Sequence, residues 1–218
     1  MPTLTPNEVR VLGSLIEKQI TTPEYYPLTL NALRQASNQT SSRNPVVSLD
    51  DRTVEAALTT LREKGLVRIV HSVHNRATKY RHVADEQLRL DDRQQALLTV
   101  LLLRGAQTAG ELRTRTDRMA SFDALADVEG VIDGLADRDE PLVARIERQA
   151  GQKDARYVHL LGAAADGHTA EAVSSAARPD GPAQEHPAGV PAGGRADELA
   201  ERLAALEARV AALEDRLA

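Results

Sequence analysis

The chemistry that the sequence offers most plainly is attraction of a polyanion. Between Arg68 and His82 the chain carries four Lys or Arg side chains and no acidic side chain. Such a run could lie along the phosphates of a nucleic acid or enter the minor groove of a duplex. Lys and Arg also populate the solvated face of an ordinary hairpin, so both interpretations stay open. The cations are Arg68, Arg76, Lys79 and Arg81, interleaved with His71, His74 and His82.

A second candidate for polyanion binding is the polar stretch at residues 37–45, between two helix-like segments. Its amide and hydroxyl side chains can donate to phosphate oxygens. The other interpretation is a loop that satisfies its own backbone through Asn and Ser side chains. With the helix that follows, the predicted DNA contacts are Asn38, Gln39, Ser42, Arg43, Arg52 and Arg62.

The helix that follows this loop weakens the usual model of base recognition. Residues 50–64 carry four acidic side chains against three basic ones, whereas a major-groove reader normally presents excess positive charge. Asp50 and Asp51 suit the first turn, where the helix dipole favours acids. The composition of this helix therefore allows base readout without requiring it.

Motifs of catalysis are missing from the sequence. It contains no Gly-rich phosphate loop of the P-loop type, no G-x-S-x-G elbow and no Cys nucleophile. His71 and His74 form an H-x-x-H pair, but residues three apart in a strand point to opposite faces. We therefore expect a protein that is not an enzyme and that has no metal site and no cofactor.

The composition indicates a globular protein with an aliphatic core. Of 218 residues 42% are hydrophobic, but the aromatic ones are four Tyr, one Phe and no Trp. The absence of Cys excludes disulfides and thiolate metal sites and fits a reducing compartment. No apolar run approaches the length of a membrane span, and the first residues have no signal-like apolar region. We expect a cytoplasmic protein without a membrane partner.

Charge is distributed unevenly along the chain. Residues 1–90 hold 12 Lys and Arg against 9 Asp and Glu, whereas residues 91–161 hold 10 against 13. Residues 119–137 contain no Lys or Arg at all, and Gly130 and Gly134 leave one side of this segment smooth enough for close packing. We therefore expect the second segment to recruit or pack against a protein partner and not to read DNA. Its acids are Asp123, Asp127, Glu129, Asp133 and Asp137.

Two copies of one element order run through residues 1–162. Thr5 with Pro6 and Glu8 predicts the start of a first helix, and Thr29 caps a second, short helix. A third helix is expected to begin near Ser48 and to stop at Gly65, and two strand-like runs form a hairpin over residues 66–83.

The same order follows over residues 91–161, where Thr108 and Glu111 form the capping pair of the second helix. Several residue types recur at a nearly constant offset of 77 or 79 positions, which indicates two copies of one fold. The matched pairs are Leu33 and Leu112, Leu58 and Leu135, Tyr80 and Tyr157, and His82 and His159.

Three helices followed by a hairpin describe a winged helix. The fold class expected is mainly α with small β-hairpins, that is α+β, in two tandem winged-helix domains followed by a coiled-coil helix. Residues 163–196 are rich in Ala, Gly and Pro, so this segment is interpreted as a flexible linker. The predicted segments are 1–88 and 89–162 for the two domains, 163–196 for the linker and 197–218 for the coil.

The final segment carries a heptad pattern of apolar residues spaced alternately by four and three. In a parallel pair Arg202 would face Glu207 and Arg209 would face Glu214, whereas an antiparallel pair sets like charges together. The other interpretation is a helix that folds its Leu stripe back onto its own chain. We expect a parallel homodimer through Leu199, Leu203, Leu206, Val210, Leu213 and Leu217.

Several runs resemble a known family. "LTPNEVRVLGSLIEKQITTPEYYPLTLNAL", "SNQTSSRNPVVSL" and "LLLRGAQTAGELRTRT" are similar to the YceH-like family of uncharacterised bacterial proteins, and the resemblance covers residues 1–161. It implies two tandem winged-helix domains and supplies no mechanism. The chain departs from the family pattern at Thr40, where Lys is frequent, and at Val73 and His74, where the family has a Gly-rich hairpin tip.

The sequence leaves two functions open. The first is a dimeric protein that binds double-stranded DNA through the loop and wing of its first domain, as a transcriptional regulator would. The alternative is a protein-interaction adaptor that uses winged helices as a scaffold without binding DNA.

Overall fold

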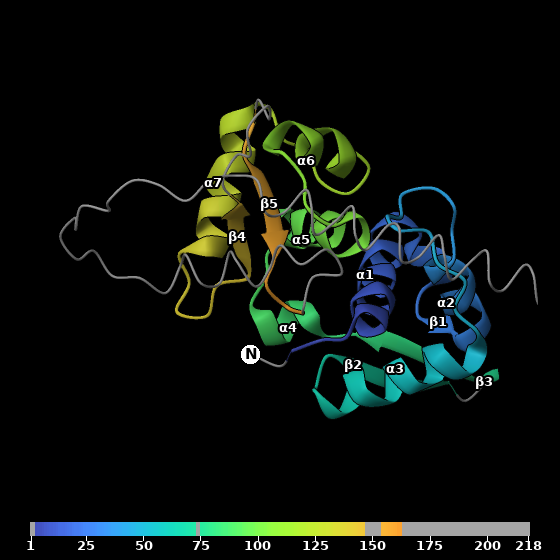
Figure 1. Cartoon of the computed structure of the whole chain (residues 1–218). Helices are drawn as coiled ribbons and strands as arrows, with labels where there is room; N and C mark the ends of the chain where they lie inside the picture. The colour runs from blue at the N-terminus through green and yellow to red at the C-terminus, as the bar shows by residue number, and fades with distance from the viewer. Residues whose placement is uncertain (1–2, 73–74, 147–153, 163–218) are drawn as a thin grey trace, which may run out of the picture. The chain divides into compact units, whose positions relative to one another are not determined.

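The computed structural model describes residues 3–72, 75–146 and 154–162, which all belong to one compact unit. Side chains at positions 71, 72, 75 and 76 are outside this description. The described chain is mostly helical with two small antiparallel sheets (Figure 1), which confirms the predicted mixture of helices and hairpins. The predicted linker and coil, with the six residues of the heptad seam, lie outside the described residues.

The first set of elements begins where local hydrogen bonds predict. Thr5 accepts from the amide of Glu8, and the Glu8 carboxylate accepts from the amide of Thr5, so both residues cap the first helix. The third helix starts at Asp51, later than expected, because Asp50 and not Ser48 provides its cap. The elements are α1 (Pro6–Thr21), η1 (Pro23–Tyr25), β1 (Leu28–Thr29), α2 (Leu30–Ser37), α3 (Asp51–Glu63), β2 (Val67–Ser72) and β3 (Asn75–His82).

The predicted hairpin is part of a three-stranded antiparallel sheet in the order β1-β3-β2. Arg68 pairs with Arg81 across β2 and β3, and Leu28 of β1 pairs with Tyr80 on the other side of β3. Strand β1 has only two residues, so no alternation of apolar and polar residues could reveal it in the sequence. It joins the start of α2 to the hairpin.

The second set of elements follows the first with one addition. Thr108 and Glu111 form the predicted capping box at the start of α6. The short helix α4 was not predicted, because five residues are too few to show a helical period. The elements are α4 (Ala84–Leu88), α5 (Asp92–Arg104), α6 (Ala109–Thr116), α7 (Leu125–Ala136), β4 (Val143–Ile146) and β5 (Arg156–His159), with β4 and β5 antiparallel.

The matched residues of the sequence repeat have matching environments. Leu33 and Leu112 are both 0% exposed. His82 and His159 both end the second strand of a hairpin and are both buried, at 1% and 6% exposure. Burial lowers the pKa of each imidazole to about 4, so both are neutral at pH 7.

The two sets of elements share one hydrophobic core. Buried residues from Leu4 to Leu161 form a single cluster, and the amide of Leu4 donates to the carbonyl of Leu161 at 2.7 Å. Helix α1 packs against α5 so closely that a Cβ on Gly13 would lie 3.0 Å from Leu103 and 3.1 Å from Leu102. Among the described helices, none combines the length and apolar character that crossing a bilayer needs.

The approach of α1 to α5 predicts the effect of a larger side chain at Gly13. We expect Gly13→Leu to lower the free energy of unfolding by about 1–3 kcal/mol, because an overpacked contact must displace its neighbours. Gly130→Leu is the matched control, since no described atom lies within 4 Å of a Cβ at Gly130 in α7. Urea unfolding of both variants measures the difference, and equal stabilities would contradict the close packing.

Candidate nucleic-acid interface

The outward face of α3 is exposed, as a recognition helix requires. Val54, Leu58 and Leu61 point into the core, whereas Arg52 and Arg62 are exposed. Within the described part of the chain neither arginine forms an ion pair. Both are free to meet a phosphate.

Acidic residues on α3 reduce this positive charge. Glu55 and Glu63 are exposed on the same helix, so they balance Arg52 and Arg62. In the first turn, Asp51 binds Arg34 of α2 at 2.7 Å. Helix α3 therefore offers two free cations and no net positive field.

The hairpin carries three of the predicted cations, Arg68, Lys79 and Arg81, on one face. The register places Arg68 opposite Arg81 and Val70 opposite Lys79, and residues paired across antiparallel strands point to the same side. Arg68 and Arg81 both approach the carboxylate of Glu86 in α4, at 3.4 and 3.3 Å.

Lys79 is the hairpin cation that keeps its charge uncompensated, since it makes no ion pair with any described residue. Arg76 belongs to β3, but its side chain is outside the described part of the structure.

His82 does not belong with the cations of the hairpin, and its inclusion there is corrected. It lies on the opposite face of β3 from Arg81, and its side chain is 0% exposed. Burial lowers the pKa of His82 to about 4, although the nearby carboxylate of Asp85 acts in the opposite direction. The described residues contain no cluster of three or more His, Cys, Asp or Glu side chains that could hold a metal ion.

Arg43 is the main departure from the predicted interface, because its guanidinium lies inside the fold. Its side chain is 0% exposed and donates to Glu17 of α1 at 2.6 and 3.1 Å. The same guanidinium donates to the carbonyl of Ala36, at 2.8 Å from Nη2. In this conformation Arg43 cannot reach a phosphate, because α1 and the end of α2 already surround it with acceptors.

The side chains of Asn38, Gln39 and Ser42 in the loop are also engaged within the protein. The amide group of Asn38 donates to the carbonyl of Leu49 and accepts from its backbone N–H, both at 2.8 Å. Gln39 accepts from Arg43 at 3.1 Å, and Ser42 accepts from Arg104 of α5 at 2.9 Å. The geometry thus agrees with the interpretation of a loop that satisfies its own polar groups.

Arg10 is a residue that sequence reasoning missed. It is 6% exposed in α1 and donates to the backbone carbonyls of Ser37 and Pro45, which fixes both ends of the polar stretch. Burial, with the nearby charge of Arg43, lowers its pKa to about 10, so it remains charged at neutral pH. Its position between Val9 and Val11 was the available signal, since an arginine in an apolar run is usually paired.

The acidic second segment leaves a helix face open. Glu129 and Asp133 of α7 are exposed, and Leu125 at its start is 43% exposed. No described atom lies within 4 Å of a Cβ at Gly130, and at Gly134 the nearest is 4.0 Å away. The close packing expected for this glycine face is therefore not made within the described chain.

Comparison with known sequences places this chain among proteins of undefined activity. A family model described as "Protein of unknown function, DUF480" matches residues 4–152. A UPF0502 protein of Pelobacter propionicus is 47% identical over 215 residues, covering 99% of this chain and 92% of the relative. Others come from Opitutus terrae, 51% identical with 78% and 75% coverage, and Mesorhizobium japonicum, 44% identical with 100% and 96% coverage.

The pair of Arg43 and Glu17 predicts a large loss of stability when one partner is removed. We expect Glu17→Ala to lower the free energy of unfolding by about 3 kcal/mol or more, because it leaves a buried guanidinium without its carboxylate. Asp51→Ala is the matched control, since it breaks an ion pair whose carboxylate is 64% exposed and should cost at most about 1 kcal/mol. Urea unfolding compares the two, and similar losses would show that Arg43 is not buried in solution.

Proposed function

The chain belongs to the DUF480 family of uncharacterised bacterial proteins, also called UPF0502, and from that premise we propose that it binds double-stranded DNA through α3 and the hairpin β2–β3. The support is the order of three helices followed by an antiparallel hairpin, which is that of a winged helix. Figure 1 draws α3 next to the strands of this hairpin. A duplex could therefore meet both elements at once.

The observation that carries the proposal is the set of cations that form no ion pair with a described carboxylate. Arg52 and Arg62 on α3 and Lys79 on the hairpin are available to phosphates. Arg68 and Arg81 share the single carboxylate of Glu86, so together they retain positive charge. No comparable set of free cations occurs on α7, whose exposed charges are acidic.

The proposed interface is smaller than the sequence suggested, because Asn38, Gln39, Ser42 and Arg43 are engaged inside the protein. With exposed acids on α3, attraction to phosphates should outweigh base readout. We therefore propose that one copy of the chain binds DNA weakly. This binding should depend on salt and show little preference for sequence. We propose that the protein has no catalytic activity and that it acts in the cytoplasm.

A second copy would raise the avidity for DNA. The heptad pattern from Leu199 to Leu217 supports a parallel homodimer on sequence grounds. Two linked copies double the phosphate contacts, so the affinity of the dimer exceeds that of either copy alone.

A protein-interaction adaptor is the second candidate, and the open face of α7 favours it. Glu129 and Asp133 flank the uncovered glycines, and Leu125 adds an exposed apolar side chain at the start of the helix. A partner helix with basic residues would fit this face, because Gly130 and Gly134 permit a close approach.

DNA binding is tested by removing the three free cations. We expect Arg52→Ala/Arg62→Ala/Lys79→Ala to weaken binding to a duplex of arbitrary sequence at least about tenfold. It should also reduce the salt slope by about 0.9 for each phosphate that the protein no longer neutralises. Fluorescence anisotropy with labelled duplex at low and moderate salt measures both effects.

The control removes three exposed arginines from the second set of elements, as Arg89→Asn/Arg93→Ala/Arg145→Ala. Asn is chosen at Arg89 because that residue has a φ of 49°, which Asn tolerates. The control should bind DNA like the wild type. A wild-type protein that does not bind at any salt would refute the DNA proposal and leave the adaptor.

The homodimer is tested by placing a charge in the heptad seam. We expect Leu206→Asp to shift the full-length protein from dimer to monomer in sedimentation velocity, because a carboxylate at a seam position cannot be buried between two helices. Ala205→Asp, which is off the seam, is the control. A wild-type monomer at all protein concentrations would end the dimer proposal.

A further inference from the structure

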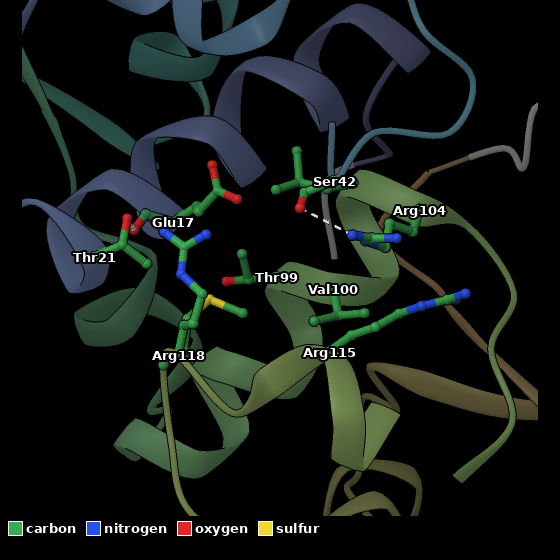
Figure 2. A pocket seen from close by; sticks show the side chains of 10 residues that line it. Glu17, Thr21, Ser42, Thr99, Val100, Arg104, Arg115 and Arg118 are labelled. Carbon is green, nitrogen blue, oxygen red and sulfur yellow. Dashed lines mark hydrogen bonds between the residues drawn. The ribbon is translucent and has the colours of Figure 1, made fainter. Parts of the chain in front are cut away.

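Three arginines that the DNA proposal does not use line one pocket. Arg104 is the last residue of α5, Arg115 lies in the last turn of α6, and Arg118 follows that helix. The pocket lies between these residues and the α1 residues Glu17 and Thr21, with Ser42 of the polar loop at its edge (Figure 2). We propose that it binds the phosphate group of a small phosphate monoester.

The pocket is built by both sets of elements. Ser42 comes from the first set and has a φ of 58°, and its hydroxyl accepts from Nη2 of Arg104 at 2.9 Å. This contact holds the guanidinium of Arg104 against the loop, as the dashed line in Figure 2 shows. The hydroxyl hydrogen of Ser42 remains free to donate to a ligand.

The carboxylates near the pocket are already paired. Glu17 binds the buried Arg43 at 2.6 Å. Glu111 lies 3.3 Å from Arg115 and 3.4 Å from Arg156. Arg104 and Arg118 have no carboxylate within ion-pair distance among the described residues, so positive charge is in excess here.

The excess of positive charge destabilises the charged form of the arginines in the pocket, and a bound anion would remove this effect. Burial lowers the pKa of Arg104, and the charges of Arg115 and Arg43 lower it further, against the opposing effect of Glu17 and Glu111. A guanidinium held among other cations in a partly buried site is stabilised when an anion enters. The pocket therefore favours binding of negative charge.

The type of donor favours a phosphate. The pocket is open to solvent, with about 370 Å³ of empty space, so a phosphate group can enter with its organic substituent at the mouth. The planar fork of arginine matches the oxygens of phosphate in pairs. Val100, Leu103 and Met119 provide an apolar side for the organic group of a monoester.

Other hydroxyls of the lining do not donate to the site. Thr99 donates to the carbonyl of Gln95 at 2.7 Å, and Thr21 donates to that of Glu17 at 2.8 Å. Recognition therefore rests on Arg104, Arg115, Arg118 and the hydroxyl of Ser42. Because these residues come from both sets of elements, a bound phosphate should also hold α5 and α6 against the polar loop.

The test is thermal unfolding of the full-length protein with inorganic phosphate or phenyl phosphate, against chloride of equal ionic strength. We expect both ligands to raise the Tm of the wild type in a saturable manner, as a ligand that binds only the folded state does. Arg118→Ala should weaken the binding of both ligands at least about tenfold. Arg118 is exposed and makes no ion pair with a described residue, so this variant should fold.

Two controls separate this site from general salt effects and from a simple need for positive charge. Arg145→Ala removes one exposed arginine outside the pocket and should respond to phosphate like the wild type. Arg118→Lys, which keeps the charge but loses the fork, should retain part of the affinity.

Three results would overturn the phosphate site. They are no shift in the wild type, an equal shift in Arg118→Ala, and a loss of duplex binding in Arg118→Ala without any effect of the small phosphates. The last result would assign these arginines to DNA. The DNA proposal itself is tested by the variant of Arg52, Arg62 and Lys79. Failure of the phosphate site and failure of DNA binding are therefore distinguishable.

Discussion

The arrangement of the described chain depends on one buried charge, the guanidinium of Arg43. A cation without solvent contact must be neutralised and hydrogen-bonded, and here Glu17 and the carbonyl of Ala36 meet that requirement. Satisfying it draws the polar loop onto α1. Arg10 holds the same loop by the carbonyls of Ser37 and Pro45. The loop is therefore part of the packed structure.

The position of the loop has consequences for the second set of elements. Once it lies on α1, the amide of Asn44 donates to the carbonyl of Leu103 at 2.9 Å, and Ser42 accepts from Arg104. These bonds add to the packing of α1 against α5 at Gly13. The arginine pocket exists because the loop closes one side of it. The loop thus joins two repeats that the sequence presented as successive domains.

Local signals predicted most of the elements. The capping boxes at Thr5 and Thr108 depend on hydrogen bonds within four residues, so the sequence contains all the required information. The offset between His82 and His159 likewise located two equivalent buried positions. The role of Arg43 was not predictable, because whether it faces solvent depends on Glu17, 26 residues earlier in the chain. A charge in a polar loop looks the same in either case.

The candidate DNA interface shows the same limit of prediction. Counting charges along residues 68–82 found the cationic hairpin, but it could not show that Glu86 of α4 lies between Arg68 and Arg81. It also could not show that Arg104 and Arg118 line one pocket beside the loop. The neighbouring Glu86 thus reduces the positive charge of the hairpin surface, whereas the neighbouring arginines raise it in the pocket beside the loop. We therefore propose phosphate binding at two separate places in this fold.

Amide hydrogen exchange at Asn44 and Leu49 tests the central claim, that the polar loop is an internal tie. Their amides donate to the carbonyl of Leu103 and to the side chain of Asn38, respectively. The account predicts that both are protected in the free protein and unchanged when duplex DNA is added. Fast exchange in the free protein, with protection only in the presence of DNA, would contradict it.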